Sequence, residues 1–247
     1  MTLFKDAFPW GIGMFLDLST FCNAGCPQCD RTNFLLPGLG KYPWIDNVMW
    51  NLERVKKAYP PSMLFKQAGV KGIKKATLCG TWGDPMMVKD IDKISYYFLE
   101  EDTELTINTN AGMREPMWWY TYGRRLSEYD AFSKVTFDID GINNEMHAKY
   151  RRKTELDKVL ANMEAFTLGG GIARAHTIVF QHNENYLNEI RDLAMKHGAR
   201  EVDFQKSNRD FPYMGEDGSQ EFRFLDEDGN PDVLRKSKID LSKALTP

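Results

Sequence analysis

Three of the four cysteines in the sequence stand close together in the stretch STFCNAGCPQCDRT (19–32). Cys22, Cys26 and Cys29 form a C-x3-C-x2-C pattern in a loop that directly follows the first predicted strand. Three thiolates on such a tight loop can hold a metal centre, whereas a disulfide framework would spread its cysteines along the chain. The pattern therefore predicts a metal site.

The number of cysteines limits which metal centre this loop could hold. A structural zinc site takes four protein ligands, and no fourth Cys or His lies nearby; Cys79 is distant and is expected to pack as a small apolar residue in a strand. A [4Fe–4S] cluster normally takes four thiolates, so three leave one iron open for a non-protein ligand and for chemistry. Two non-enzymatic alternatives stay open: an iron–sulfur redox sensor or electron carrier, and a structural zinc module.

The three cysteines resemble the signature of the radical S-adenosylmethionine (SAM) superfamily, C-x3-C-x2-C after the first strand of a barrel. The resemblance implies an oxygen-sensitive enzyme in which SAM's amino and carboxylate groups chelate the fourth iron of a [4Fe–4S] cluster. Reductive cleavage of SAM then gives a 5′-deoxyadenosyl radical that abstracts hydrogen from a substrate. Gln28 departs from the aromatic residue often found before the third cysteine, so no adenine contact is expected there.

Two further segments resemble the superfamily at the ends of the next predicted strands. GTWGDP (80–85) matches its Gly-Gly-Glu-Pro-like segment, which implies that Gly83 and Asp84 face the amino group of SAM. INTNAG (107–112) matches a common Thr-Asn-x-Gly ending, which makes Asn110 a candidate contact at the strand mouth. The alternative is that both segments are simple turns.

The segment FDIDGINNEMHAKYRR (137–152) resembles the superfamily's strand-then-loop pattern with a later His and Arg. The resemblance places Asp138 at the ribose hydroxyls and Arg151 at a carboxylate, with Arg152 as an adjacent rival. His147 is expected to be an exposed loop histidine rather than a catalytic one.

The fifth predicted strand and the residues after it supply weaker candidates. Val179 matches an apolar strand residue that contacts adenine, and plain core packing is its alternative. Asn183 is a candidate cap for the following helix. The aromatic stretch with Trp118, Trp119, Tyr120 and Tyr122 is expected to pack a helix.

Strands and helices alternate along the chain. Six strands joined by helical crossovers predict an α/β fold with a parallel sheet, either an open doubly wound sheet or, as the resemblance implies, a partial (β/α)6 TIM-like barrel. In both designs the site lies at the carboxyl ends of the strands, where the candidate residues stand. The strands are expected at 13–19, 75–80, 104–110, 134–140, 174–180 and 201–205, and the helices near 44–59, 87–100, 116–128, 154–168 and 185–197.

Length and composition are those of one globular domain with an extension. The 247 residues carry a net charge of −3, which gives no overall electrostatic attraction to nucleic acid. They are 42% hydrophobic, as is typical of a globular protein. No apolar run of about 18 residues and no signal peptide are recognised, so a cytoplasmic location without membrane contact is expected. We expect a core domain at 1–208 and a polar, turn-rich C-terminal extension at 209–247, either a surface tail or a lid or docking segment.

The substrate is predicted only by class. Similarity to the peptide- and protein-modifying branch favours a peptide or another small polar molecule, and a nucleotide, sugar or cofactor precursor is the alternative. Residues 80–247 contain no cysteine, so no auxiliary cluster domain is expected. The electron is expected to come from a donor such as flavodoxin or ferredoxin.

Overall fold

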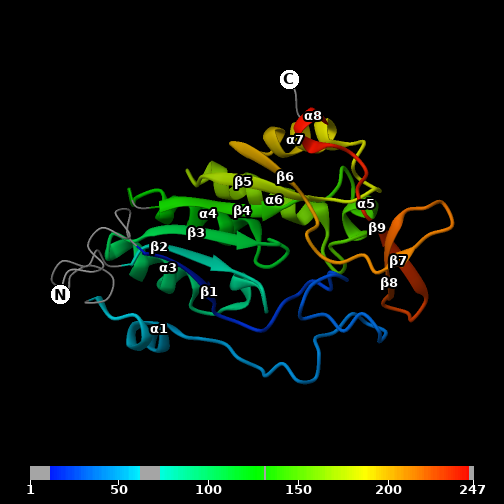
Figure 1. Cartoon of the computed structure of the whole chain (residues 1–247). Helices are drawn as coiled ribbons and strands as arrows, with labels where there is room; N and C mark the ends of the chain where they lie inside the picture. The colour runs from blue at the N-terminus through cyan, green and yellow to red at the C-terminus, as the bar shows by residue number, and fades with distance from the viewer. Residues whose placement is uncertain (1–11, 62–72, 131, 245–247) are drawn as a thin grey trace, which may run out of the picture.

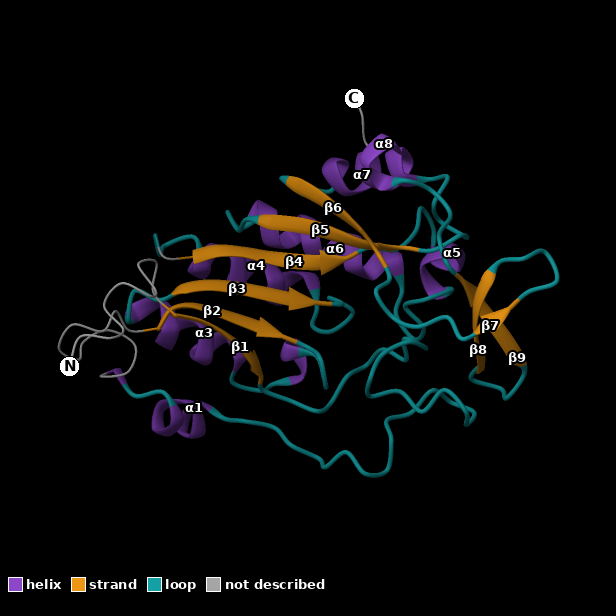
Figure 2. Ribbon diagram, in the orientation of Figure 1, coloured by secondary structure: helices purple, strands orange, loops and turns teal. Residues whose placement is uncertain are grey.

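A sheet of six parallel strands dominates the computed structural model of the protein, which describes residues 12–61, 73–130 and 132–244. The strands pair in their order along the sequence, and those described do not close into a barrel (Figure 2). The predicted α/β partial barrel is therefore confirmed. Its strands are β1 (Ile12–Asp17), β2 (Ile73–Cys79), β3 (Glu104–Thr109), β4 (Phe132–Asp138), β5 (Ala173–Val179) and β6 (Glu201–Lys206).

Helices cover one face of this sheet. In Figures 1 and 2 the helices α3, α4 and α6 lie behind the strands, and the near face is left open. Among the described helices, none is both long and apolar enough to cross a membrane. The helices are α1 (Leu52–Ala58), η1 (Pro85–Met87), α3 (Ile91–Glu100), α4 (Pro116–Leu126), α5 (Asn144–Ala148), α6 (Leu156–Leu168), α7 (Leu187–Lys196) and α8 (Leu241–Ala244).

One expected helix is shorter than its sequence pattern suggested. The residues from 44 to 51 form an irregular segment, and α1 begins only after Asn51, whose side-chain oxygen accepts a hydrogen bond from Arg54 N at 2.9 Å. Thr20 Oγ1 accepts from Val48 N at 2.9 Å, and Trp50 N donates to Leu18 O at 2.8 Å. These long-range bonds hold the segment against the loop after β1 in a non-helical conformation.

The core lies between the sheet and its covering helices. Trp119 of α4, Phe137 of β4 and Phe166 of α6 are fully buried, with ring centroids 5.1 to 5.9 Å apart. Trp119 and Tyr122 pack in the core as predicted from the sequence, and Trp118 packs at its edge, whereas Tyr120 is exposed.

Alternation along β5 separates this core from the open face. Ala173, Ala175, Thr177 and Val179 are buried toward the helices, while the residues between them are only half-buried. Because successive side chains of a strand point to opposite faces, Arg174, His176 and Ile178 line the open face. The sheet thus presents polar side chains on the face that no helix covers.

The chain after β6 folds as a second, antiparallel sheet of β7 (Tyr213–Met214), β8 (Gln220–Leu225) and β9 (Pro231–Arg235). Figure 1 shows it beside the loops that follow β1. Phe222 packs against Phe34 with ring centroids 4.7 Å apart, and Leu225 N donates to Phe34 O at 2.9 Å. Arg152 forms ion pairs with Glu227 and Asp232. The extension is therefore packed onto the cysteine-bearing half of the molecule.

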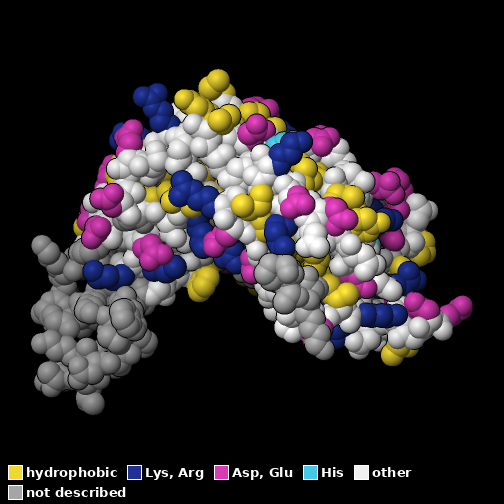
Figure 3. Space-filling model, turned by 90° about the horizontal axis from the view of Figure 1, so that it is seen from above, with side chains coloured by type: hydrophobic (Ala, Val, Ile, Leu, Met, Phe, Trp, Pro, Cys, Tyr) yellow, Lys and Arg dark blue, Asp and Glu magenta, His cyan; other side chains and the backbone are white. Residues whose placement is uncertain are grey.

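Charged side chains of both signs are interspersed over the described part of the face seen in Figure 3. This mixed distribution agrees with the small net charge of −3.

Close packing of α4 on α6 gives a first testable prediction. A Cβ on Gly123 would lie 2.2 Å from the backbone oxygen of Phe166, whereas a Cβ on Gly40 would meet no atom within 4 Å. Overpacking costs about 1–3 kcal/mol, and here it opposes the gain of about 1 kcal/mol in helix propensity. We expect Gly123→Ala to lower the free energy of unfolding by about 1 to 2 kcal/mol in urea titrations, because the clash is with backbone that cannot give way, and Gly40→Ala to change it by less than about 0.5 kcal/mol. Equal midpoints for the two variants would contradict this packing.

Candidate cofactor site at the carboxyl ends of the strands

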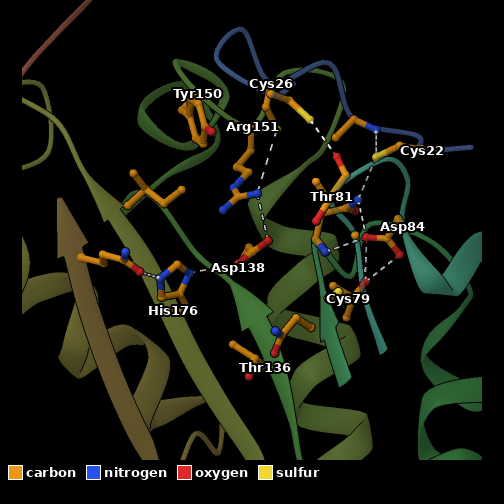
Figure 4. A pocket seen from close by; sticks show the side chains of 18 of the residues that line it. Cys22, Cys26, Cys79, Thr81, Asp84, Thr136, Asp138, Tyr150, Arg151 and His176 are labelled. Atoms are coloured by element: carbon orange, nitrogen blue, oxygen red, sulfur yellow. Dashed lines mark hydrogen bonds and ion pairs between the residues drawn. The ribbon is translucent and has the colours of Figure 1, made fainter. Parts of the chain in front are cut away.

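A cavity of about 750 Å³ opens at the carboxyl ends of the parallel strands. Its wall contains the three clustered cysteines together with residues from β2 through β6 and the loops after them (Figure 4). Of the residues proposed from the sequence, the wall brings together Cys22, Cys26, Cys29, Gly83, Asp84, Asn110, Asp138 and Arg151.

The cysteine loop is held by contacts that leave its thiols free. All three cysteines are free thiols, and Cys26 is 8% exposed. The loop turns through a Cys29 N to Cys26 O hydrogen bond of 3.0 Å, and Gly25 N donates to Arg152 O at 3.0 Å. On its outer side Cys26 packs in an apolar cluster with Tyr150, Phe180 and Phe222 and their neighbours. The loop is therefore a buried wall of the cavity and not an exposed turn.

Burial favours the protonated form of these three thiols. It raises the pKa of Cys22 well above the usual value and that of Cys26 to about 12, because desolvation disfavours a thiolate. Arg151 acts in the opposite direction on Cys26, with Nη1 4.0 Å from Sγ. Because metals bind the thiolate, metal binding here must release protons.

The 80–84 loop packs tightly against the loop after β1. A Cβ on Gly83 would lie 2.1 Å from the backbone oxygen of Ser19, and one on Gly80 would lie 1.9 Å from the oxygen of Gly83. Only glycine allows so close an approach of two backbones. Asp84, which follows, begins η1 by accepting a hydrogen bond from Met86 N at 2.8 Å.

The carboxylate of Asp84 is the centre of a buried hydrogen-bond network. It accepts from Thr109 Oγ1 at 2.9 Å, from Asn110 N at 2.9 Å and from Asn110 Nδ2 at 2.8 Å. Burial raises the pKa of Asp84 to about 6, although these hydrogen bonds favour the ionised form. Asp84 thus organises the ends of β2 and β3, and Asn110 extends the network to the cysteine loop, 3.1 Å from Asn23 Oδ1 and 3.5 Å from Cys22 Sγ.

Arg151 lies between two carboxylates on the other side of the cavity. Nη1 is 2.9 Å from Asp138 Oδ2, and Nε is 2.5 Å from Asp140 Oδ2. His176 Nδ1 lies 3.3 Å from the second oxygen of Asp138. Burial alone would raise the pKa of Asp138, but Arg151 and His176 outweigh it and hold that pKa below its usual value. The arginine is therefore locked in orientation beside Cys26 (Figure 4).

Two residues of this network were not recognised in the sequence as functional candidates. Asp140 is fully buried and fixes Arg151, and it also accepts a hydrogen bond from Ile178 N at 2.6 Å. His176 alternates with buried residues on β5, so the period of two along this strand was the available signal for its place in the cavity.

Three expectations for individual residues are corrected by the structure. Val179 is 1% exposed and belongs to the core, whereas its neighbour Ile178 lines the cavity, because alternate residues of β5 face opposite sides. Asn183 does not cap α7; its side chain binds the backbone of Phe180 and Ile178 within the loop. His147 is completely buried and not exposed, because the residues after β4 fold back as α5 against the core.

His147 is neutral and connects Asp140 to Thr154 through hydrogen bonds. Asp140 N donates to Nδ1 at 3.2 Å, so the ring proton is on Nε2, which donates to Thr154 Oγ1 at 3.1 Å. Thr154 Oγ1 in turn donates to Arg151 O at 2.6 Å. Burial lowers the pKa of His147 to about 4.

Residues 16–194 match the family model for the radical SAM superfamily, which is most of the chain. The chain belongs to the radical SAM superfamily. Members of this superfamily are enzymes that use SAM and an iron–sulfur cluster.

Two relatives with curated names are GTP 3′,8-cyclases. A GTP 3′,8-cyclase of Nautilia profundicola is 24% identical over 147 residues, covering 58% of this chain and 44% of that protein. A GTP 3′,8-cyclase of Clostridium botulinum is 24% identical over 153 residues, covering 58% of this chain and 46% of that protein. The chain therefore spans less than half the length of these relatives.

Solved radical SAM structures share the fold. SuiB of Streptococcus suis, bound to its precursor peptide SuiA, superposes with a TM-score of 0.58 at 15% identity over 78% of this chain and 39% of SuiB. anSMEcpe with bound AdoMet gives a TM-score of 0.58 at 14% identity over 82% of this chain and 53% of that protein. At these identities the similarity is one of fold.

The residues of the cavity fit an iron–sulfur cluster better than a single ion. Within 12–61, 73–130 and 132–244, no group of three or more His, Cys, Asp or Glu side chains could hold one metal ion. In a [4Fe–4S] cluster each thiolate binds a different iron, so its cysteines need not converge on one point. Three free thiols on one wall of a polar cavity suit such a group.

The neutral state of His147 predicts a pH dependence of stability. Between pH 4 and 6.5 the folded protein binds fewer protons at this ring than the unfolded chain, so stability is lost as the pH falls through this window. Between pH 7 and pH 5 the contribution is about 2 kcal/mol. We expect His147→Gln to reduce, by about that amount, the loss of unfolding free energy between urea titrations at these two pH values. Identical losses in both proteins would contradict a neutral buried histidine, because all other titrating groups are shared.

Proposed function

We propose that this protein binds one [4Fe–4S] cluster through Cys22, Cys26 and Cys29 and reductively cleaves SAM at the open iron. The composition of the cavity wall is the observation that supports this proposal most directly. It unites three free thiols of one loop with the Asp84–Asn110 network and with the oriented Arg151. When bound, the reduced cluster and SAM supply a 5′-deoxyadenosyl radical that abstracts hydrogen from a substrate.

The residues around the thiols have proposed roles in holding SAM. The 80–84 backbone, shaped by Gly83 and fixed by Asp84, is proposed to accept hydrogen bonds from the ammonium group of SAM. Arg151 is proposed to bind the carboxylate of SAM, and Asp138 and Asp140 fix its orientation. Asn110 and Asp138 also line the cavity and are proposed to contact SAM, Asp138 at the ribose hydroxyls.

For the substrate, a peptide is our first proposal. It is supported by the open polar face of the sheet, where Arg174, His176 and Gln205 line the cavity, and by the peptide-bound structures of SuiB and anSMEcpe, which share the fold. The second candidate is a nucleotide, because the curated relatives are GTP 3′,8-cyclases. A low-potential donor such as flavodoxin or ferredoxin is the proposed source of the electron.

Anaerobic reconstitution tests the first part of the proposal. With iron, sulfide, dithionite and SAM, the protein is expected to become brown and to release 5′-deoxyadenosine and methionine. Cys26→Ala should lose both products and most of the iron. Cys79→Ala, the matched control outside the C-x3-C-x2-C loop, should retain its iron. A colourless protein, or equal iron in both variants, would contradict the assignment.

Substrate dependence separates the two candidates. Two kinds of candidate substrate are added, in separate reactions, to the reconstituted protein: peptides encoded by genes next to that of this protein, and GTP. The 5′-deoxyadenosine formed is compared with the amount formed without substrate. A more than tenfold increase with a peptide supports the first proposal. An increase with GTP alone would replace it by the nucleotide alternative.

A further inference from the structure

Arg31 is a buried cation with no carboxylate partner, two residues after the third cysteine. Its side chain lies in the cavity wall, and the residue is only 7% exposed. One nitrogen, Nη2, donates to Thr20 O at 3.4 Å, while the buried Nε has no hydrogen-bond partner. Among the described residues no Asp or Glu forms an ion pair with it, in contrast to Arg151, Arg152 and Arg209.

Such an arrangement is unfavourable unless an anion completes it. A guanidinium taken out of water must be compensated by an opposite charge or by a full set of hydrogen bonds. Arg31 has a single long hydrogen bond to a neutral carbonyl. The unpaired charge and the unpartnered Nε therefore point to a negatively charged group that binds at this wall of the cavity.

The position of Arg31 indicates which anion this is. Arg31 lines the same cavity as Cys22 and Cys29, and it follows Cys29 by two residues in the loop. Arg151 stands on the other side of the loop, at Cys26, but its charge is already balanced by Asp138 and Asp140. Of these two arginines beside the cysteines, only Arg31 carries an uncompensated charge.

We propose that Arg31 is the counter-charge of the thiolate-ligated cluster and that it raises the cluster's reduction potential. This inference rests on the proposed [4Fe–4S] site. Three thiolates give the cluster a net negative charge, and one-electron reduction by a low-potential donor adds another. A fixed positive charge in a water-poor wall stabilises the reduced state more than the oxidised state, so it eases the reduction that must precede SAM cleavage. Arg31 is thus a positioning and tuning residue rather than a ligand.

The test is a redox titration of the reconstituted protein without SAM, monitored by the EPR signal of the reduced cluster. Arg31→Gln is expected to lower the equilibrium constant for reduction about tenfold, which is about 59 mV for one electron. Arg31→Lys, which keeps the charge, should change it less than threefold. Arg209→Gln is the matched control, because Arg209 also lines the cavity but is exposed and paired with Asp30; it should change the constant less than twofold.

A potential that is unchanged in Arg31→Gln would overturn the inference. So would a tenfold weaker SAM affinity at unchanged potential, since the anion would then be the SAM carboxylate. Failure of the wild-type protein to assemble any cluster would instead refute the proposed function, and the two failures are therefore distinguishable.

A second measurement does not need the cluster. Metal-free Arg31→Met, which keeps much of the apolar stem but removes the charge, should unfold at a higher urea concentration than metal-free wild type. A lower midpoint for this variant would show that the arginine is already compensated in the metal-free protein and would overturn the inference.

Discussion

The hydrogen bonds of Asn110 tie the cysteine loop to the ends of the central strands. Its amide nitrogen lies 2.8 Å from the Asp84 carboxylate and 3.1 Å from Asn23 Oδ1, and its backbone N also donates to Asp84. One residue at the end of β3 therefore holds the loop after β1 and the loop after β2 in a fixed relation. These hydrogen bonds help to keep the three cysteines on one wall of the cavity.

A second constraint acts from the outer side of the same loop. Phe222 and Phe224 of the antiparallel sheet pack in the apolar cluster that contains Cys26 and Tyr150. Arg152 binds that sheet through Glu227, while Arg151, its neighbour, faces the cavity. Arg151 and Arg152 therefore make their contacts on opposite sides of the cavity wall. The result is a cysteine loop that is dry on its outer face, where charges inside the cavity are weakly screened and act strongly on one another.

Much of the fold could be predicted from local sequence patterns. The expected strand at 104–110 corresponds to β3 (Glu104–Thr109), and the one at 201–205 to β6 (Glu201–Lys206), because apolar or alternating runs between turn residues specify strands directly. The expected helix at 44–59 was mostly wrong, since hydrogen bonds to Thr20 and Leu18 hold its first half in an irregular, non-helical conformation. His147 was misplaced for a similar reason: its burial depends on Asp140 and Thr154, which no local pattern connects to it.

The sequence by itself was enough to recognise the superfamily. The spacing of Cys22, Cys26 and Cys29, and their place after a strand, identified the superfamily, because ligand type and loop length are local properties of the chain. Only the tertiary structure decided which charges meet around that loop. Arg151 is balanced by two carboxylates from β4 and the residues after it, Arg31 is left without one, and Val179 faces away from the cavity. Charge balance and burial depend on residues far apart in the chain, so they are fixed only when the strands bring those residues together.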